Sequence, residues 1–313
     1  MSTVLNQSAT TATTPAQRLR RTMAAVRVSV RWFGIRRSLN AAQKAEAAEP
    51  FGAEAKFLSA GKKLLDNTAP SFKAVTAVRG KVIAFWKSLS LPYPEPGIRL
   101  IRQDRIDDFA AKMREFQEEL AEAVENLDRD YSDLKATARR QLGSLFNSAD
   151  YPDSLTNMFG IEFDFPSVDA PSYLEQLNPQ LYEEECRRVQ SRFDEAVRLA
   201  EDAFTAELAK LLSHLTERLS GAEDGKQRVF RDSIVENLSE FFQRFRQLNV
   251  RSNEQLDRLV ADAQQVIRGV APQDLRDNSG LRQHVATEMS RVQSVLDGLL
   301  VDKPRRNILR RPR

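Results

Sequence analysis

The sequence predicts a mainly α-helical protein: a long antiparallel, coiled-coil-like helical hairpin with a small β-sheet and a C-terminal helical cluster. Three observations predict this fold class. Apolar residues recur every three or four positions over most of residues 104–300. Two short segments alternate apolar and polar residues instead, which is typical of strands. The composition, 41% hydrophobic and 29% charged, is typical of a globular chain.

Charge divides the chain into a cationic head, an anionic body and a cationic tail. Residues 1–103 carry 17 Lys or Arg against 5 Asp or Glu, a net charge of +12. Residues 104–302 carry 24 against 39, a net charge of −15, and residues 303–313 hold six basic side chains and no acid. Such asymmetry bears on association with partners and not on the fold.

The head is expected to begin with a disordered basic tail over residues 1–22, since Ser, Thr, Ala and Gln dominate it. An Arg-rich, acid-free start is also typical of a mitochondrial transit peptide, which is the less favoured reading. A basic region of strand and helices over residues 23–103 follows. Residues 26–32 alternate Val or Trp with Arg or Ser and predict a strand.

Two helices are expected next, over residues 53–66 and 71–90, because apolar residues recur there at helical spacing. Three prolines within residues 91–97 end the second helix and mark a boundary. Residues 98–101 predict a short extended segment after it.

A long helical hairpin with an inserted strand is predicted over residues 104–220. From Ile106 to Leu127 the apolar residues alternate steps of three and four, which is the coiled-coil pattern. From about 179 to 220 the apolar residues follow an eleven-residue repeat, which predicts a nearly straight helix. We expect these two helices to pack antiparallel, and to bury Phe109, Phe116, Leu120, Phe193, Phe204, Leu208 and Leu215 as helix-packing residues.

The remaining elements are one strand and three shorter helices. Residues 161–165 alternate apolar and acidic residues and are the expected partner of the strand at 26–32. Apolar spacing predicts helices over 226–248, 253–269 and 279–300, so residues 221–302 are expected to form a helical cluster. A basic tail, 303–313, completes the chain.

No catalytic residue, metal ligand or cofactor site is expected. The Gly61-Lys62-Lys63 segment lacks the other residues of a phosphate-binding loop and is expected to be a solvated helix face. Cys186 is expected to be a small buried side chain in the eleven-residue row, although two neighbouring arginines leave a reactive thiol open. His214 and His284 have no Glu three positions before them, which excludes the Glu-x-x-His pattern of di-metal helical bundles.

Positive charge is the remaining functional signal. The candidate residues for binding a polyanion are Arg27, Arg31, Arg36, Arg37, Lys62, Lys63, Arg305, Arg306, Arg310 and Arg311. Trp32, Phe33 and Trp86 are interleaved with basic residues and could stack on bases, or they could belong to the core. The basic amphipathic pattern of 71–90 also fits a membrane-surface helix, although a helix packed on a core shows the same pattern more often.

Several ordered motifs resemble one family. They are VRVSVRWFGIRR (26–37), SLPYPEPGIRLI (90–101), DDFAAKMREFQEEL (107–120), RRQLGSLFNSADYP (139–152), IEFDFPSV (161–168), FRDSIVENLSEFFQRFRQLNV (230–250) and LDRLV (256–260). Over residues 24–300 the chain resembles an uncharacterised helical family of phages and prophages, the domain of unknown function 3150 group. Tyr93 replaces the tryptophan usual in that family. The resemblance implies no catalytic residues, and it implies an accessory or adaptor role beside AAA+ machinery.

The sequence therefore predicts a non-enzymatic, cytoplasmic interaction or scaffold protein of phage or mobile-element type. It would present a rigid helical face to a protein partner or to further copies of itself. The alternative is a nucleic-acid-binding protein that uses the basic N-terminal region and the C-terminal tail. A membrane is not an expected partner.

Overall fold

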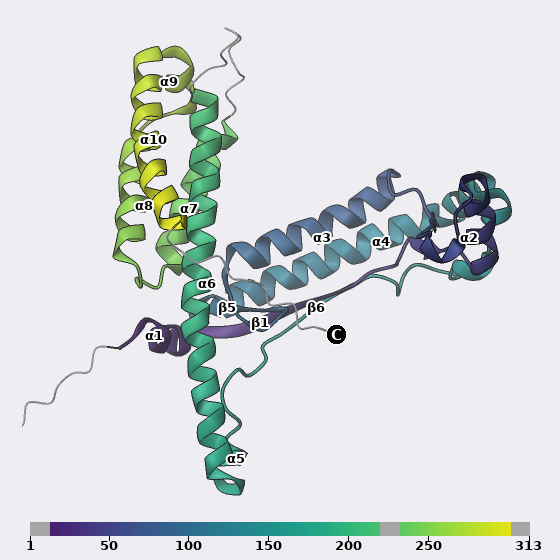
Figure 1. Ribbon diagram of the computed structural model, residues 1–313, viewed down its shortest axis with the longest axis horizontal. Helices are drawn as coiled ribbons and strands as arrows, with labels where there is room; N and C mark the ends of the chain where they lie inside the picture. The colour runs from purple at the N-terminus through teal and green to yellow at the C-terminus, as the bar shows by residue number, and fades with distance from the viewer. Residues whose placement is uncertain (1–12, 220–231, 302–313) are drawn as a thin grey trace, which may run out of the picture. The chain divides into compact units, whose positions relative to one another are not determined.

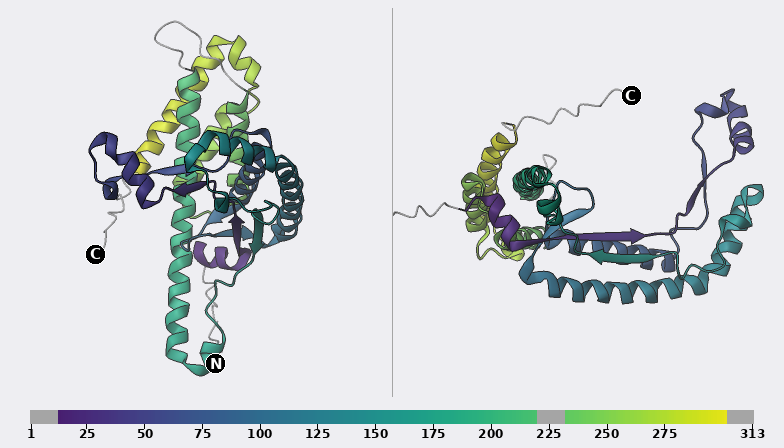
Figure 2. Two further views of the ribbon diagram at one scale, coloured as in Figure 1. Left: turned by 90° about the vertical axis from the view of Figure 1, so that its right-hand side faces the viewer. Right: turned by 90° about the horizontal axis from the view of Figure 1, so that it is seen from below.

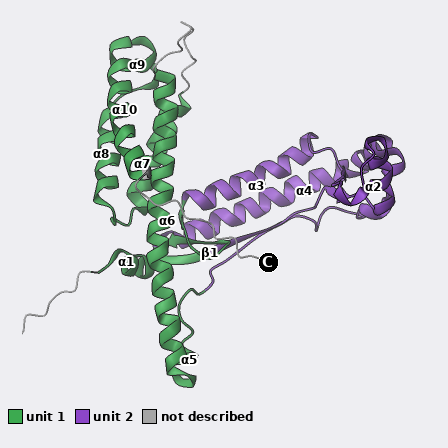
Figure 3. Ribbon diagram, viewed as in Figure 1, with its two compact units in different colours: residues 1–25, 89–103, 167–313 green, residues 26–88, 104–166 purple. Residues whose placement is uncertain are grey.

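A computed structural model describes residues 13–219 and 232–301, which divide into two compact units (Figure 3). Unit 1 contains the described residues up to 25, then 89–103, and those from 167 onward. Unit 2 contains residues 26–88 and 104–166. The described residues are mainly helical with a small antiparallel sheet (Figure 1), which confirms the prediction of a mainly α-helical fold with a small β-sheet.

Two packed helices are the longest elements of unit 2. Helix α3 (Pro70–Ser88) packs along α4 (Ile106–Leu142). The apolar row predicted for α4 is the buried side of this pair, and Phe85 of α3 stacks on Phe109 of α4 with ring centres 5.7 Å apart. Helix α4 ends at Gly143, whose φ of +51° is a conformation that glycine adopts most readily.

The strands confirm the predicted pairing. Strand β1 (Met23–Arg31) pairs antiparallel with β6 (Gly160–Asp164), with Val28 opposite Phe163. The four-stranded sheet has the order β4-β5-β1-β6, and β4 (Ser90–Pro92) pairs antiparallel with β5 (Ile98–Arg102). A separate two-stranded sheet joins β2 (Arg36–Ser38) to β3 (Gly61–Lys63).

Helix α6 (Pro179–Leu219) is the central helix of unit 1. Helices α1 (Pro15–Thr22), α7 (Ser233–Leu248) and α10 (Ser279–Val301) pack against it. Helices α8 (Glu254–Ile267) and α9 (Pro272–Asp277) pack on α10, and the short α5 (Tyr173–Leu177) precedes α6 (Figures 1 and 2). The three predicted C-terminal helices are thus present, apart from residues 226–231, which lie outside the described residues.

The predicted pairing of the two long helices was wrong. Helix α4 packs on α3 within unit 2, whereas α6 packs on α1, α7 and α10 within unit 1. Each long helix buries its apolar row inside its own unit. Periodicity identifies a helix face that must be covered, and any apolar partner can cover it. The two units also divide the chain differently from the expected consecutive regions, because each unit draws on separated segments.

The predicted helix over 53–66 was also wrong. The segment contains a 3₁₀ turn, η2 (Ala55–Phe57), and then strand β3. A Cβ atom at Gly61 would lie only 3.0 Å from the Arg37 carbonyl oxygen, so the close approach of the two strands favours glycine there. Leu64 and Leu65, which follow the strand, are buried.

The end of the expected disordered tail is folded. Thr14 and Gln17 form a reciprocal capping box at the start of α1. Ala16 and Leu19 on the next turns are buried in the core of unit 1. The rest of the predicted tail, residues 1–12, lies outside the described residues.

Within unit 2 the cationic head contacts the anionic body. Arg27 pairs with Asp164, Lys62 with Asp150, and Lys81 with Glu119. Unit 2 contains 19 basic and 19 acidic residues, because its head segment (26–88) carries 12 against 4 and its body segment (104–166) carries 7 against 15. Folding therefore balances the opposite charges of the two segments within one unit, and these ion pairs join the segments.

Candidate interaction surface

The strands β2 and β3, called the ribbon below, hold a cluster of basic residues. Arg36 lies opposite Lys63, and Arg37 lies opposite Lys62. The hydrogen bonds continue beyond both ends of the paired strands, from Leu64 N to the Ile35 carbonyl oxygen (2.7 Å) and from Leu39 N to that of Ala60 (3.1 Å). The six strand residues contain four basic side chains and no acid.

One of these four basic residues anchors the ribbon. The Lys62 side chain is buried, lies 2.6 Å from a carboxylate oxygen of Asp150 and donates a hydrogen bond of 2.7 Å to the Leu145 carbonyl oxygen. Nearby, the Tyr151 hydroxyl donates to the Leu64 carbonyl oxygen at 2.8 Å. These contacts fix the ribbon to the segment that follows α4. Lys62 is therefore a buried structural residue, and the expectation that it lies on a solvated helix face was wrong.

The other three basic side chains, Arg36, Arg37 and Lys63, are exposed. They border a hollow of about 470 Å³ whose remaining lining comes from Ser38 and residues 59–62. The hollow combines guanidinium and ammonium groups with backbone and hydroxyl groups, which is the chemistry that recognises carboxylates and phosphates.

Residues 40–60, called the cap below, connect the two strands of the ribbon. The cap contains α2 (Ala41–Ala48) and the 3₁₀ turns η1 (Glu49–Phe51) and η2, which both pack on α2. It lies at the end of unit 2 that holds the last turns of α4 (Figures 1 and 2). Ala48 is the one buried residue of the cap, so the cap has almost no core of its own.

Two phenylalanines of the cap face solvent. Phe51 and Phe57 are each 81% exposed, which is exceptional because aromatic side chains are normally buried for most of their area. Lys56 lies with its ammonium group 5.0 Å from the centre of the Phe57 ring. The cap therefore presents two exposed apolar rings, one of them beside the ammonium group of Lys56.

Two further polyanion candidates, Arg27 and Arg31, contact other parts of unit 2. Arg27 hydrogen-bonds Asp164, and this contact holds the pKa of the Asp164 carboxyl below its usual range. The Arg31 guanidinium lies over Gly160. The last four candidates, Arg305, Arg306, Arg310 and Arg311, lie outside the described residues. The structure thus brings together Arg36, Arg37, Lys62 and Lys63, of which Lys62 is already paired.

The interleaved aromatic residues are packed inside unit 2. Trp32 meets Phe159 edge to face, with ring centres 4.9 Å apart, and the Arg79 guanidinium covers its ring at 5.3 Å. Phe33 and Trp86 are buried. The core interpretation of these residues therefore fits the structure better than base stacking.

The seven predicted helix-packing residues are all buried, within one or the other unit. Phe109, Phe116 and Leu120 lie on the buried row of α4 in unit 2. The others belong to the core of unit 1: Phe193, Phe204, Leu208 and Leu215. None of them is exposed for a partner.

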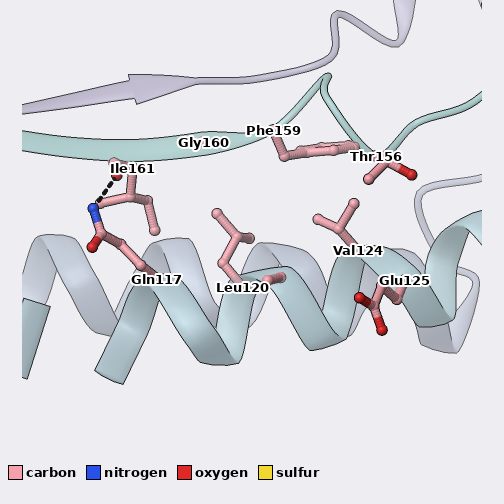
Figure 4. Close-up of a pocket in the computed structure, with 9 residues that line it drawn as sticks. Gln117, Leu120, Val124, Glu125, Thr156, Phe159, Gly160 and Ile161 are labelled. Carbon is pink, nitrogen blue, oxygen red and sulfur yellow. Dashed lines mark hydrogen bonds between the residues drawn. The ribbon is translucent and has the colours of Figure 1, made fainter. Parts of the chain in front are cut away.

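A shallow apolar groove of about 260 Å³ lies between α4 and the segment that leads into β6 (Figure 4). Leu120 and Val124 of α4 face Phe159 across it. At one end the Gln117 side-chain amide donates a hydrogen bond of 2.8 Å to the Ile161 carbonyl oxygen. Glu125 is the one ionisable residue of the lining, and the other lining residues are mostly apolar.

Other potential chemistry is sparse in the described residues. Cys186 is half-buried, and its hydrogen bond with Tyr182 raises the pKa of the Tyr182 hydroxyl. Within residues 13–219 and 232–301, no three His, Cys, Asp or Glu side chains gather in a way that could hold a metal ion. No helix in these ranges combines the length and apolar character needed to cross a bilayer.

Comparisons with known proteins add no assignment: no protein-family model, curated protein or solved structure matches the chain. The resemblance to a phage-associated family stays a prediction.

Phe51 and Phe57 are the surface residues that the sequence interpretation missed. Phe57 fell within the expected helix over 53–66, where an aromatic residue at helical spacing is usually core. For Phe51 a local signal exists, because Pro50 and Gly52 flank it and indicate a turn. Gly52 has a φ of +58°, as such a turn requires.

Proposed function

We propose that this protein is a non-enzymatic interaction protein that binds a protein partner through the cap and ribbon of unit 2. The observation that carries the proposal is the exposure of Phe51 and Phe57 on a segment with a single buried residue. Aromatic residues and arginines are both enriched at protein–protein interfaces, and the cap and ribbon carry both. The apolar rows of α4 and α6 are covered within their own units, so the contact surface differs from the helical face that the sequence favoured.

The cap and ribbon also suit an adaptor. The capping box of Asn40 and Gln43 starts α2, and the ion pair of Lys62 with Asp150 anchors the base of the ribbon. The surface is therefore carried on an element that the Lys62 ion pair fixes to the segment after α4. An adaptor role beside AAA+ machinery in a mobile element is compatible with such a surface and stays a prediction.

Site-specific photo-crosslinking tests the proposal. A benzophenone amino acid replaces Phe57 in the full chain expressed in cells, and a second variant carries it at Val295. Val295 is the matched control because it is an exposed apolar residue on α10, outside the cap. We expect one discrete adduct from position 57 and none from position 295. Absence of any adduct from position 57 would refute the proposal.

Nucleic-acid binding is the second candidate, and the ribbon favours it. Arg36, Arg37 and Lys63 border one hollow and carry no neutralising acid on either strand. Three phosphate contacts would weaken binding about 40-fold between 50 and 200 mM salt, because each contact releases a counterion. Anisotropy of labelled single- and double-stranded DNA measures this slope.

An Arg36→Ala/Arg37→Ala variant should lose most of the salt dependence. Arg258→Ala/Arg291→Ala, which removes two exposed arginines of unit 1, should keep it. If the wild-type protein binds neither DNA at 50 mM salt, this second candidate is excluded.

A further inference from the structure

Exposed apolar side chains gather at two places in the described residues. Seven large hydrophobic residues are exposed there, and five of them belong to two short segments. Phe51 and Phe57 lie on the cap, and Tyr173, Leu177 and Leu181 lie on α5 and the first turn of α6. Isolated exposed apolar residues are common, but grouped ones mark interaction sites.

The second group lies on a helical segment that has no core of its own. Tyr173 is 64% exposed and Leu177 is 77% exposed, and with Leu181 they follow one another at intervals of four residues. No residue from 171 to 188 is buried, and Val189 is the first buried residue of α6. Helix α5 and the first turns of α6 lie at the end of α6 away from α9 (Figure 3). This end of unit 1, residues 171–188, is called the α5–α6 end below.

The charges of the two surfaces are opposite. The α5–α6 end contains four glutamates and two arginines, a net charge of −2. Glu183 and Glu185 contact Arg187 and Arg188 one turn further along α6, while the carboxylate of Glu184 is exposed. The cap and ribbon carry Arg36, Arg37, Lys44, Lys56 and Lys63 against Glu46, Glu49 and Glu54, apart from the paired Lys62.

We propose that the partner of the cap and ribbon is the α5–α6 end of a second copy of this chain. The inference rests on the proposed function and names its partner. Apolar rings on one surface meet apolar side chains on the other, and the arginines of the ribbon meet the glutamates of α5 and α6. Such complementarity favours and orients association.

The contact joins two different surfaces, so it is heterologous. Each copy has one free cap and one free α5–α6 end, and association therefore continues head to tail. It produces a ring where the rotation between copies closes and an open chain of copies where it does not. The protein would thus act as its own scaffold subunit.

Complementation between two variants tests this arrangement. Phe51→Ser/Phe57→Ser removes the apolar surface of the cap, and Tyr173→Ser/Leu177→Ser removes that of the α5–α6 end. All four residues are exposed, so both variants should fold, which circular dichroism and urea denaturation verify. Sedimentation velocity then measures the size of the wild-type protein, of each variant and of their mixture.

We expect concentration-dependent oligomers for the wild-type protein below about 100 μM, since interfaces of this kind reach micromolar affinity. Each variant alone should be monomeric. An equimolar mixture should form a 1:1 dimer and stop there, because the intact cap of one variant binds the intact α5–α6 end of the other. Raising the salt concentration should weaken the dimer.

Three outcomes would overturn the inference. A monomeric wild-type protein over this range would exclude self-association. Oligomers that survive in the Tyr173→Ser/Leu177→Ser variant would show that the α5–α6 end is not the partner. A monomer that binds DNA through Arg36 and Arg37 would favour the nucleic-acid function instead. If position 57 crosslinks to a different protein while the wild type stays monomeric, the proposed function survives and this inference fails.

Discussion

Lys62 shows how one residue changes its role on folding. Its neighbour Lys63 is exposed and donates a hydrogen bond to Asn67, whereas the Lys62 side chain is 7% exposed and pairs with Asp150. A buried charge is tolerated when a counter-charge and further hydrogen bonds satisfy it, and Asp150 and the Leu145 carbonyl supply both.

We predict that Lys62→Met lowers the free energy of unfolding by about 3 kcal/mol, because it leaves the carboxylate of Asp150 without its partner. The matched control Lys63→Met should change it by less than about 0.5 kcal/mol. Urea denaturation at neutral pH measures both. Equal effects of the two substitutions would contradict the structural role of Lys62.

Tyr131 couples the stability of unit 2 to alkaline pH. Burial raises the pKa of its hydroxyl to about 12, and the hydroxyl donates a hydrogen bond of 3.0 Å to the Pro152 carbonyl oxygen. Between pH 10 and 12 the folded state holds this proton more tightly than the unfolded chain, so unfolding releases it.

The contribution of Tyr131 to the free energy of unfolding should therefore be fully present below about pH 10 and be lost as the pH rises toward 12. Tyr131→Phe should reduce this decline. Burial also raises the pKa of Tyr93 and Tyr151, so part of the decline should persist. Urea denaturation at pH 9 and pH 11 gives the comparison, and an unchanged decline in the variant would argue against Tyr131 as a source.

At the scale of elements, substitutions in α1 test whether this helix packs stably in unit 1. Its Leu19 is buried in the core of unit 1, where α1 packs on α6, whereas Arg21 on the same helix is exposed. Leu19→Ala should lower the free energy of unfolding by about 2–5 kcal/mol because it leaves a cavity. Arg21→Ala should have little effect. A small effect of both substitutions in urea denaturation would indicate that α1 does not pack stably.

Helices were predictable as elements but their partners were not. Regular apolar spacing located α3 and α6 to within about two residues of their observed ends. The same spacing predicted the wrong packing partner for α4, because an apolar row on a helix does not identify the surface that covers it.

The ribbon was missed for a related reason. Two strands of three residues are too short to show an alternation of apolar and polar residues. Their position also depends on contacts with Asp150 and Tyr151, which lie almost ninety residues away from β3 in the sequence. The basic residues of the candidate surface were identifiable from composition. The exposure of Phe51 and Phe57 was not, because a phenylalanine is expected in the core unless its surroundings fail to cover it.

At the scale of the whole molecule, the chain crosses between its two units several times. All of unit 2 lies within residues 26–166, but that range also contains β4 and β5, which belong to unit 1. Leu91, Tyr93, Ile98 and Leu100 of these strands are buried in the core of unit 1. Neither unit is therefore an uninterrupted piece of the sequence.

We predict that a fragment of residues 26–166 retains helical circular dichroism but binds a hydrophobic dye and self-associates, because those four side chains lose their cover. Substituting Leu91 and Ile98 with serine in the fragment should reduce dye binding. A monomeric fragment that binds no dye would show that the two strands do not need the core of unit 1.

The hydrogen bond from Gln117 to Ile161 protects one edge of the four-stranded sheet. Strand β6 is the last strand in the order β4-β5-β1-β6, so one of its sides has no neighbouring strand in that sheet. Unpaired backbone groups at such an edge can form hydrogen bonds with strands of other molecules. Repeated pairing of this kind leads to amyloid-like aggregation. The Gln117 amide occupies the Ile161 carbonyl oxygen and thereby removes one of the acceptors that an incoming strand would use. A side chain on a helix thus protects an otherwise open sheet from irregular growth.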